Sequence, residues 1–541
     1  TVRVANADLT GLTFNATTAG DVTLVVDRTG LTTTSTNANI WTGVDDLVLV
    51  DSAAPAVGGD GGSVSGLKVG QKVTFANDFN ASVLAFSNAT GSTDTATIVL
   101  DNATALTDTD VAQINAQSVE TLVITSNGFA SSTSSTAENL IDDLVGDATT
   151  ITVNGDTSVE LDLNIDAASS GTRTVVVNAS ANTAFVNIEA AAGAGATSTI
   201  TVAYNITGTS GSDTLSLNGI GGTLSGGDGN DTLTGGALND TISTGAGTDI
   251  VFATTGTDTV TFGTGVDTII FGEADVTAVA QTTTLQPAGL DIGTVSVNVN
   301  GITYNQVFVT GPDETAAAFV VQHAAAILTN AGVTVTAVVD AGDDILKFVG
   351  ASTGAAFTAS ATYFDSTVAE AAAIVTTAGV AGVSVATTIV DFTTGASGDV
   401  ISLDISEMNA VTGIDTVRDS TDDVAGGDAV ELTAYAGAAV TMAAGANVIK
   451  VTFANTINSA ADVLTLIDAN NITVAGAVSS TDKIVITFYD ADAGSMIVGL
   501  LQSADAVTAL DDNMSINEIA IVGMTSAQYT ALTAANFSFV L

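Results

Sequence analysis

The sequence has no cysteine and very little positive charge. The absence of cysteine excludes disulfide bonds and thiolate metal sites. Nine Lys and Arg stand against 58 Asp and Glu, which gives a formal net charge of -49. The few basic residues are scattered, so no basic patch is present that would bind phosphate groups. Such a chain repels nucleic acid and anionic lipid and attracts cations, and we therefore expect no nucleic-acid partner.

Histidine is almost absent as well, since His323 is the only one. A zinc protease of the H-E-x-x-H type is thereby excluded. A Ser-His-Asp triad would have to use His323, yet no G-x-S-x-G motif is present. His323 lies on the apolar side of a predicted helix, which favours a structural role. Aromatic residues are few, with Trp41 the only tryptophan, and this argues against a sugar cleft, although hydrolysis by carboxylates alone stays open. We predict that the protein is not an enzyme.

Membrane-spanning and targeting segments are not evident. The uncharged run at residues 371–390 is long enough to cross a bilayer, but its glycines, threonines and strand-rich surroundings argue against a transmembrane helix. We therefore predict no transmembrane span. The first residue is Thr1, and no signal-peptide pattern follows it, so we expect a processed chain or a piece of a longer one.

Short alternating strands are what the sequence has in abundance. Hydrophobic residues make up 46% of it, and the alternating runs at 21–27, 45–51 and 120–126 favour a β-sandwich or an irregular β-solenoid. We predict a mainly β, multidomain protein in which a parallel β-roll lies between β-sandwich or β-solenoid domains and one small α/β module. The predicted domains are a β-rich region at 1–206, the roll at 207–281, the α/β module at 282–362 and a C-terminal β-rich region at 363–541.

Two regions outside the roll give clear local predictions. Residues 312–332 are the best helix, because acids open it and Phe319, His323 and Ile327 follow one another at intervals of four. An Asn-Gly pair at 300–301 predicts a hairpin before that helix. In the C-terminal region we predict a hairpin with its turn at 490–495 and a capping box that opens at Thr525.

The region from 208 to 279 is a strict repeat of eight units of nine residues. The sixth position is an aspartate in six of the eight units, and the eighth position is apolar in all eight. The aspartates are Asp213, Asp231, Asp240, Asp249, Asp258 and Asp267, and the sixth position of the two other units holds Gly222 and Val276.

Each unit predicts a glycine-rich turn followed by a three-residue strand that buries one side chain. Two units complete one coil, so aspartates that are two units apart stack on the same edge of the roll. Stacked carboxylates repel one another unless a cation lies between them, and oxygen ligands on flexible loops favour Ca²⁺ over Mg²⁺. The alternative is an acidic, glycine-rich linker without metal, but a linker has no reason to keep an apolar residue at every eighth position.

Residues 226–234 fit every position of the pattern GGxGxDxUx, and the repeat region thereby resembles the calcium-binding nonapeptide repeats of the RTX family. The resemblance implies several bound Ca²⁺ ions. The metal ligands that we expect are the six aspartates together with Gly226, Asp228 and Gly229. The later segment 391–404 resembles the strand-turn-strand that follows such arrays, and we interpret Asp391 and Asp399 as turn residues.

Among RTX proteins, the chain most resembles the S-layer proteins of Gram-negative bacteria, through its strands rich in Thr, Ala, Val and Asn, the segment 118–126 and a repeat block inside the chain. The resemblance implies type I secretion guided by a C-terminal signal, an extracellular location at the cell surface, and self-assembly into a calcium-dependent lattice or filament. It also implies attachment to surface polysaccharide through a region not recognised in this sequence. An RTX adhesin or biofilm-matrix protein is the first alternative, and a secreted hydrolase is the second.

Overall fold

The computed structural model forms two compact units, which comprise Thr1–Gly272, Thr387–Ile516 and Ala520–Leu541 in the first and Glu273–Ala386 with Asn517–Ile519 in the second. The residues that it describes are 1–5, 14–15, 22–27, 36–37, 41–50, 62–76, 78, 82–86, 89, 91–101, 109–116, 118–128, 138–166, 171–193, 200–271, 282–286, 294–307, 312–331, 333–340, 343–349, 358–365, 368–371, 373–377, 387–404, 432–436, 441–442, 447–452, 457, 459–470, 472–478, 483–502, 507–509 and 515–540. The second unit is therefore an insertion in the sequence of the first.

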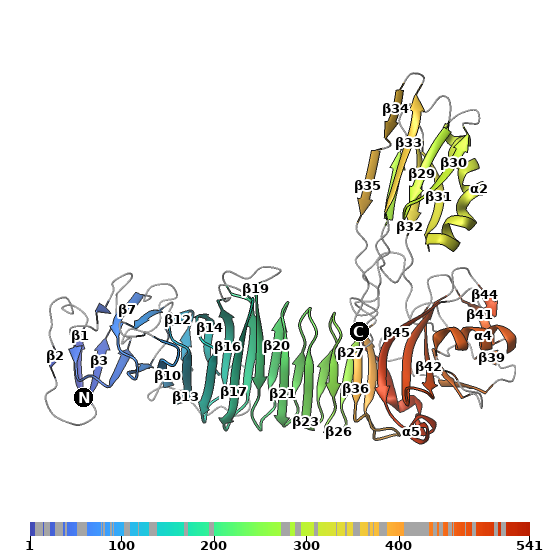
Figure 1. The fold of residues 1–541 in the computed structure, drawn as a ribbon. Helices are drawn as coiled ribbons and strands as arrows, with labels where there is room; N and C mark the ends of the chain where they lie inside the picture. Colours follow the sequence, from blue (N-terminus) through green and yellow to red (C-terminus); the bar gives the residue numbers. More distant parts are fainter. Residues whose placement is uncertain are drawn as a thin grey trace. The chain divides into compact units, whose positions relative to one another are not determined.

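The first unit is built on a parallel β-solenoid, in which successive strands alternate between two sheets (Figure 1). The β1 sheet runs through β1 (Val2–Ala5), β3 (Thr23–Asp27), β6 (Asp46–Val50), β8 (Lys72–Phe75), β10 (Thr95–Asp101), β13 (Thr121–Asn127), β15 (Thr150–Gly155), β17 (Gly171–Asn182), β19 (Ile200–Thr207), β21 (Gly221–Asp228), β23 (Thr241–Gly247), β25 (Thr259–Thr261), β36 (Thr387–Val390) and β45 (Ser515–Gly523), with β26 (Thr264–Gly265) beside β23. Every one of these pairings is parallel.

The β4 sheet forms the other side of the solenoid. It runs through β4 (Thr36–Asn37), β7 (Gly62–Leu67), β9 (Ser82–Phe86), β12 (Ile114–Ala116), β14 (Asn139–Gly146), β16 (Val159–Ile165), β18 (Val186–Ala191), β20 (Thr214–Asn218), β22 (Thr232–Thr234), β24 (Ile250–Phe252), β27 (Thr268–Phe271), β37 (Val400–Asp404) and β46 (Phe537–Val540), with β11 (Asp110–Val111) beside β14. A separate short pair consists of β2 (Phe14–Asn15) and β5 (Trp41–Thr42).

The core of the solenoid lies between its sheets, because alternate side chains of each strand point inward. In the repeat region each strand contributes the apolar residue of the eighth position. The buried residues of this column are Leu215, Leu233, Val251 and Ile269 from the β4 sheet and Leu224, Ile242 and Val260 from the β1 sheet. The predicted mainly β fold with a parallel β-roll is confirmed, and the parallel pairing of residues 1–206 shows a solenoid rather than a sandwich.

Among the described residues, the C-terminal part of the first unit adds mixed strands and two α-helices. Its elements are β38 (Leu432–Tyr435), β39 (Thr441–Met442), β40 (Val448–Val451), α4 (Ala460–Asn470), β41 (Thr473–Val478), β42 (Lys483–Asp490), β43 (Ser495–Gln502), β44 (Val507–Ala509), α5 (Ser526–Ala531) and the 3-10 turn η3 (Ala534–Asn536). A core that includes Tyr435, Val463 and Phe488 packs α4 against these strands. The predicted hairpin is confirmed, since Asp490 faces Ser495 in an antiparallel pair, and so is the capping box between Thr525 and Gln528.

The second unit is an α/β module with two antiparallel sheets and one long helix. Its elements are β28 (Thr282–Gln286), β29 (Thr294–Val299), β30 (Ile302–Val307), α2 (Pro312–Ala331), β31 (Thr334–Asp340), β32 (Asp343–Val349), β33 (Ala359–Asp365), β34 (Val368–Ala371) and β35 (Ala373–Thr377). Phe319 and Ile327 of α2 are buried against Val297 and Phe348, so the predicted helix and its apolar side are confirmed. The Asn-Gly hairpin is confirmed too, with positive φ at Asn300 and Gly301.

The insertion interrupts the repeat array. In the β1 sheet Val260 of β25 is paired with Ile389 of β36, and in the β4 sheet Ile269 of β27 is paired with Ile401 of β37. The strands that continue the two sheets after the seventh repeat unit therefore come from the part of the sequence that follows the second unit. Most of the eighth predicted unit, residues 272–279, lies outside the described residues.

Candidate functional site

The aspartates of the repeats form a hydrogen-bonded ladder along one edge of the roll. Asp213, Asp231, Asp249 and Asp267 stand directly before strands of the β4 sheet, and Oδ1 of each of the last three accepts the main-chain N–H of the aspartate one coil earlier. The N–H of Asp213 donates to Asp231 at 2.8 Å, that of Asp231 to Asp249 at 2.8 Å, and that of Asp249 to Asp267 at 3.0 Å. All three pairs are separated by 18 residues in the sequence. These four carboxylates are buried, with at most 1% of each residue exposed.

A second, shorter ladder lies on the β1 sheet. The N–H of Asp240 donates to Oδ1 of Asp258 at 2.9 Å, and the N–H of Gly222 donates to Oδ1 of Asp240 at 2.7 Å. Gly222 contributes no carboxylate of its own, so this ladder begins at Asp240. Asp231 and Asp240 are consecutive in the repeat but belong to different sheets, since they precede β22 and β23.

The second carboxylate oxygen distinguishes the first members of the ladders from Asp231 and Asp249. Oδ2 of Asp213 accepts the N–H of Thr209 at 2.6 Å, and Oδ2 of Asp240 accepts the N–H of Gly236 at 2.6 Å. In contrast, Oδ2 of Asp231 and Oδ2 of Asp249 are buried without a hydrogen-bond partner among the described residues. A buried carboxylate oxygen without a donor is costly, and a cation would satisfy it.

Glycine lets the main chain approach one of these oxygens closely. A Cβ atom on Gly226 would lie 2.2 Å from Oδ2 of Asp231 and 2.5 Å from the carbonyl oxygen of Thr244. A carboxylate oxygen and a main-chain oxygen thus lie close together beside Gly226, where a side chain would clash with both. Gly229 has a φ of 114° and passes close to the carbonyl of Gly211, which only glycine can do. Asp228 is exposed at the surface of the same turn.

Burial raises the pKa of most of these carboxyl groups. The pKa of Asp231 rises to about 7, first through burial and then through the neighbouring charges of Asp213, Asp249 and Asp228. The pKa of Asp258 likewise rises to about 7 and that of Asp267 to about 6, both mainly through burial. Burial also shifts the pKa values of Asp213 and Asp240 upward. In the absence of a cation, ionising these groups therefore costs free energy.

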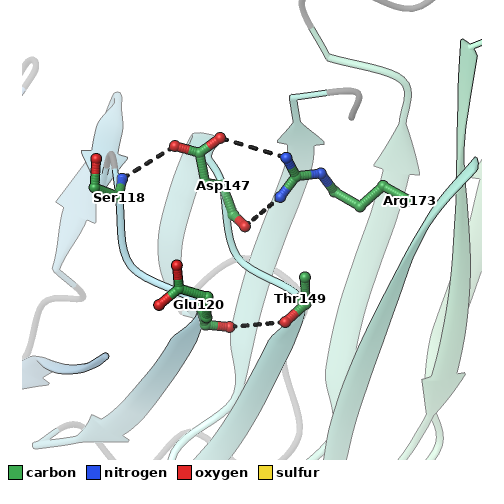
Figure 2. Close-up of polar contacts among 5 residues, drawn as sticks. All are labelled: Ser118, Glu120, Asp147, Thr149 and Arg173. Atoms are coloured by element: carbon green, nitrogen blue, oxygen red, sulfur yellow. Dashed lines mark hydrogen bonds and ion pairs between the residues drawn. The ribbon is translucent and has the colours of Figure 1, made fainter. Parts of the chain in front are cut away.

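Elsewhere in the solenoid, a partly exposed acid is balanced by a basic side chain. Figure 2 shows Asp147, whose Oδ2 accepts the N–H of Ser118 at 3.0 Å while the guanidinium of Arg173 binds its Oδ1 at 3.4 Å and its carbonyl oxygen. Close to Asp147 in the same coil, Thr149 donates its hydroxyl to the carbonyl of Glu120 (Figure 2). The repeat region at 208–279 contains no Lys or Arg. Within the repeats, no Lys or Arg side chain is therefore present to balance the aspartates.

No group of three or more His, Asp or Glu side chains in the described part of the chain converges on one metal position. A cation at the ladder would therefore also need main-chain oxygens, such as the carbonyl of Thr244. Oxygen ligands of both kinds are what Ca²⁺ prefers. The donor set at the turns thus fits a hard cation.

A parallel roll that lines its edge with buried aspartates and glycine turns belongs to the class of cation-binding β-solenoids. Residues 225–260 and 234–269 match the family model of the RTX calcium-binding nonapeptide repeat. The chain therefore carries RTX repeats, which bind several calcium ions per set, and Ca²⁺ is its cofactor. No match is found among the curated proteins or among the solved structures. RTX repeats are typical of secreted proteins, and none of the helices in the described residues is long and apolar enough to span a membrane.

One member of the ladder was not predicted from the sequence. Asp399, interpreted from the sequence as a turn residue, directly precedes β37 and accepts the N–H of Asp267 on its Oδ1 at 2.9 Å. The sequence does carry a pattern that indicates this role. Asp399 is followed two residues later by the core residue Ile401, and each repeat aspartate has its core residue at the same spacing. His323 lies between Tyr304 and Phe319 and contacts the carbonyl oxygen of Asn305 at 3.0 Å.

Proposed function

We propose that this protein is a secreted structural protein that self-assembles into a calcium-dependent surface layer or sheath. The observation that carries the proposal is the ladder itself. Its buried aspartates are used for hydrogen bonds between coils and have no basic partner in the repeats, which supports a role in holding a structure together rather than in turning over a substrate. The excess of acidic over basic residues supports the same function, since calcium can bridge acidic surfaces.

The proposed calcium ligands are the carboxylates of the ladders, with Oδ2 of Asp231 and Oδ2 of Asp249 as the strongest candidates because neither has a donor among the residues that the structure describes. Gly226 and Asp228 lie in β21 and Gly229 follows it, ahead of Asp231, and the carbonyl of Thr244 lies close to Gly226. Asp213, Asp240, Asp258 and Asp267 complete the proposed set. When bound, calcium supplies the positive charge that these carboxylates lack, and the turn residues hold the oxygens in place.

Calcium binding would couple the folding of the roll to export. Extracellular calcium modules have dissociation constants of about 10⁻⁴ to 10⁻³ M, well above the cytosolic calcium concentration. The roll would therefore stay unfolded inside the cell and fold after secretion. We propose type I secretion and a location at the cell surface, with other copies of this chain as partners and surface polysaccharide as the anchor, reached through a region that we do not identify in this sequence.

Electron microscopy of the purified protein tests the assembly. We expect an ordered lattice or filament at millimolar Ca²⁺ and its dispersal by excess chelator, because the ladder loses its counter-charge. The double variant Asp231→Asn/Asp249→Asn should assemble poorly at the same calcium concentration. Asp492→Asn, in the exposed turn of the β42–β43 hairpin, is the matched control and should assemble normally. An assembly that looks the same with and without chelator would show that calcium is not required.

An RTX adhesin or biofilm-matrix protein is the second candidate, and the second unit favours it. Val321 and Leu328 of α2 are 90% and 54% exposed, and Val307 of the edge strand β30 is 66% exposed. Exposed apolar residues of this size on a small module are typical of a contact surface. A chain that stays monomeric at millimolar Ca²⁺ would favour this alternative over the surface layer.

A further inference from the structure

The ladder on the β4 sheet does not end with the repeats. The N–H of Asp267 donates to Oδ1 of Asp399 with the same geometry as the contacts inside the array, although 132 residues rather than 18 separate the two. The N–H of Val400 in turn donates to the carbonyl of Asp267 at 2.7 Å, as the N–H of Thr268 does to the carbonyl of Asp249 at 2.8 Å. Asp399 therefore occupies the next position of the ladder after the insertion.

Asp399 differs from Asp231 and Asp249 because the protein satisfies both of its carboxylate oxygens, as it does those of Asp267. While Oδ1 accepts from Asp267, Oδ2 accepts the N–H of Thr393 at 2.7 Å. Only 1% of Asp399 is exposed. At the start of the same ladder, Oδ2 of Asp213 likewise accepts a main-chain N–H, that of Thr209. The two ends of the ladder thus share one arrangement, and the donor-free oxygens of Asp231 and Asp249 lie between them.

The position after Asp399 holds a neutral amide. Asn536 is completely buried directly before β46, and its Nδ2 donates to the carbonyl of Asp399 at 2.9 Å. Its Oδ1 accepts the N–H of Gly395 at 3.1 Å and that of Thr533 at 3.2 Å. An amide adds no charge to the ladder, so the position of Asn536 needs no cation. The strands β37 and β46 follow in parallel register, with Ile401 opposite Phe537.

We propose that Asp399 and Asn536 are positioning residues that end the calcium ladder and make the docking of β37 and β46 depend on calcium in the repeats. Calcium orders the carboxylates of the array, and the ordered Asp267 presents the N–H that Asp399 requires. Asp399 then holds the returning chain through Thr393, and Asn536 holds the last strand through the carbonyl of Asp399. This inference rests on calcium binding by the repeats and is independent of the assembly proposed above.

Hydrogen–deuterium exchange of the full-length chain during a Ca²⁺ titration from excess chelator tests this coupling. In the wild-type chain, we expect amides of β22, β24, β37 and β46 to gain protection at the same calcium concentration. Amides of β29 and α2 in the second unit should show no calcium dependence, because no ladder residue lies in them. The proposal is wrong if β37 and β46 are equally protected with and without calcium.

Substitutions at the end of the ladder separate positioning from metal binding. In Asp399→Ala, β37 and β46 should exchange roughly tenfold faster at saturating calcium, because the loss of these contacts favours local opening, while β22 and β24 keep their calcium midpoint. Asp399→Asn keeps an acceptor for Asp267 but places an NH₂ group against the N–H of Thr393, so an intermediate effect is expected. Asn536→Asp should accelerate exchange in β46, because it removes the donor to Asp399 and adds a like charge.

Equilibrium dialysis against Ca²⁺ provides the second readout. Because Asp399 is proposed to position strands rather than to bind an ion, Asp399→Asn should bind as many calcium ions as the wild-type chain. A loss of one bound ion with unchanged protection of β37 and β46 would overturn the proposal and make Asp399 a ligand. Asp492→Asn, with the same charge change at an exposed turn, should leave both the exchange pattern and the bound calcium unchanged.

Discussion

At the scale of single residues, the balance of charge decides what the repeats require. The solenoid neutralises Asp147 with Arg173, whereas the repeats have only oxygen atoms and main-chain donors to offer their aspartates. The unpartnered Oδ2 atoms of Asp231 and Asp249 show where this balance is incomplete. A glycine beside such an oxygen is then part of the site, because any side chain there would collide with the oxygen.

Replacing Gly226 by alanine tests this role of glycine. The added Cβ would lie 2.2 Å from Oδ2 of Asp231, so the turn has to shift. We expect a loss of about 1–3 kcal/mol in the free energy of unfolding with calcium present, together with weaker calcium binding. Chemical denaturation and a calcium titration measure the two effects. Gly523→Ala is the control, because its Cβ would meet nothing nearer than 3.6 Å and both quantities should hardly change. An equal loss in the two variants would contradict the prediction.

At the scale of strands and sheets, the regular period made the array predictable. Each repeat strand buries one side chain, so the spacing of apolar residues and aspartates specifies both the sheet and the stacking. Outside the array the coils vary in length, since Thr95 pairs with Thr121 and Thr121 pairs with Thr150. No period could reveal a parallel solenoid there, and alternation alone fits a sandwich equally well. Asp399 escaped prediction for a related reason, because an insertion of arbitrary length precedes it.

Neighbouring strands of the β4 sheet also carry a pH-dependent contact. Asp162 of β16 lies opposite Glu189 of β18, and its pKa rises to about 6 through burial first and then through Glu189, Glu160, Asp142 and Asp143. The folded state therefore holds this proton more tightly than the unfolded state. The resulting stabilisation is present at low pH and is lost as the pH rises through about 6.

Asp162→Asn should remove this pH dependence. We expect the variant to unfold at a higher temperature than the wild-type chain at pH 7.5 and at nearly the same temperature at pH 4, because the amide resembles the protonated acid. Thermal unfolding at the two pH values measures the effect. Asp156→Asn changes an exposed turn residue by the same chemistry and should show no such difference. A stabilisation of equal size at both pH values would argue against a titration of Asp162.

At the scale of the whole molecule, calcium should act on one unit and not on the other. The ladders lie in the first unit, whereas the second unit is held by an apolar core around Phe319 and Phe348. Each calcium site filled to 100 times its dissociation constant contributes about 2.7 kcal/mol to the stability of the folded roll. The second unit gains nothing by this route.

Scanning calorimetry with calcium and with chelator checks the difference. We expect two unfolding transitions, of which the one belonging to the first unit moves to higher temperature with calcium while the other stays in place. Asp231→Asn/Asp249→Asn should reduce the shift of the first transition and leave the second unchanged. A single transition that moves as a whole would show that the two units unfold together.

The pairing of β25 with β36 and of β27 with β37 has a consequence for the evolution of such proteins. The chain leaves the roll after β27 in the β4 sheet and re-enters it at β36 in the β1 sheet, so the coil continues with the segment between these strands as an insertion. A different domain, or a short loop, could replace it while the coils on either side keep their registers. Sequence changes at the exposed surface can then accumulate in the inserted segment. Selection on the roll would act on the aspartates of the ladders and on the apolar core.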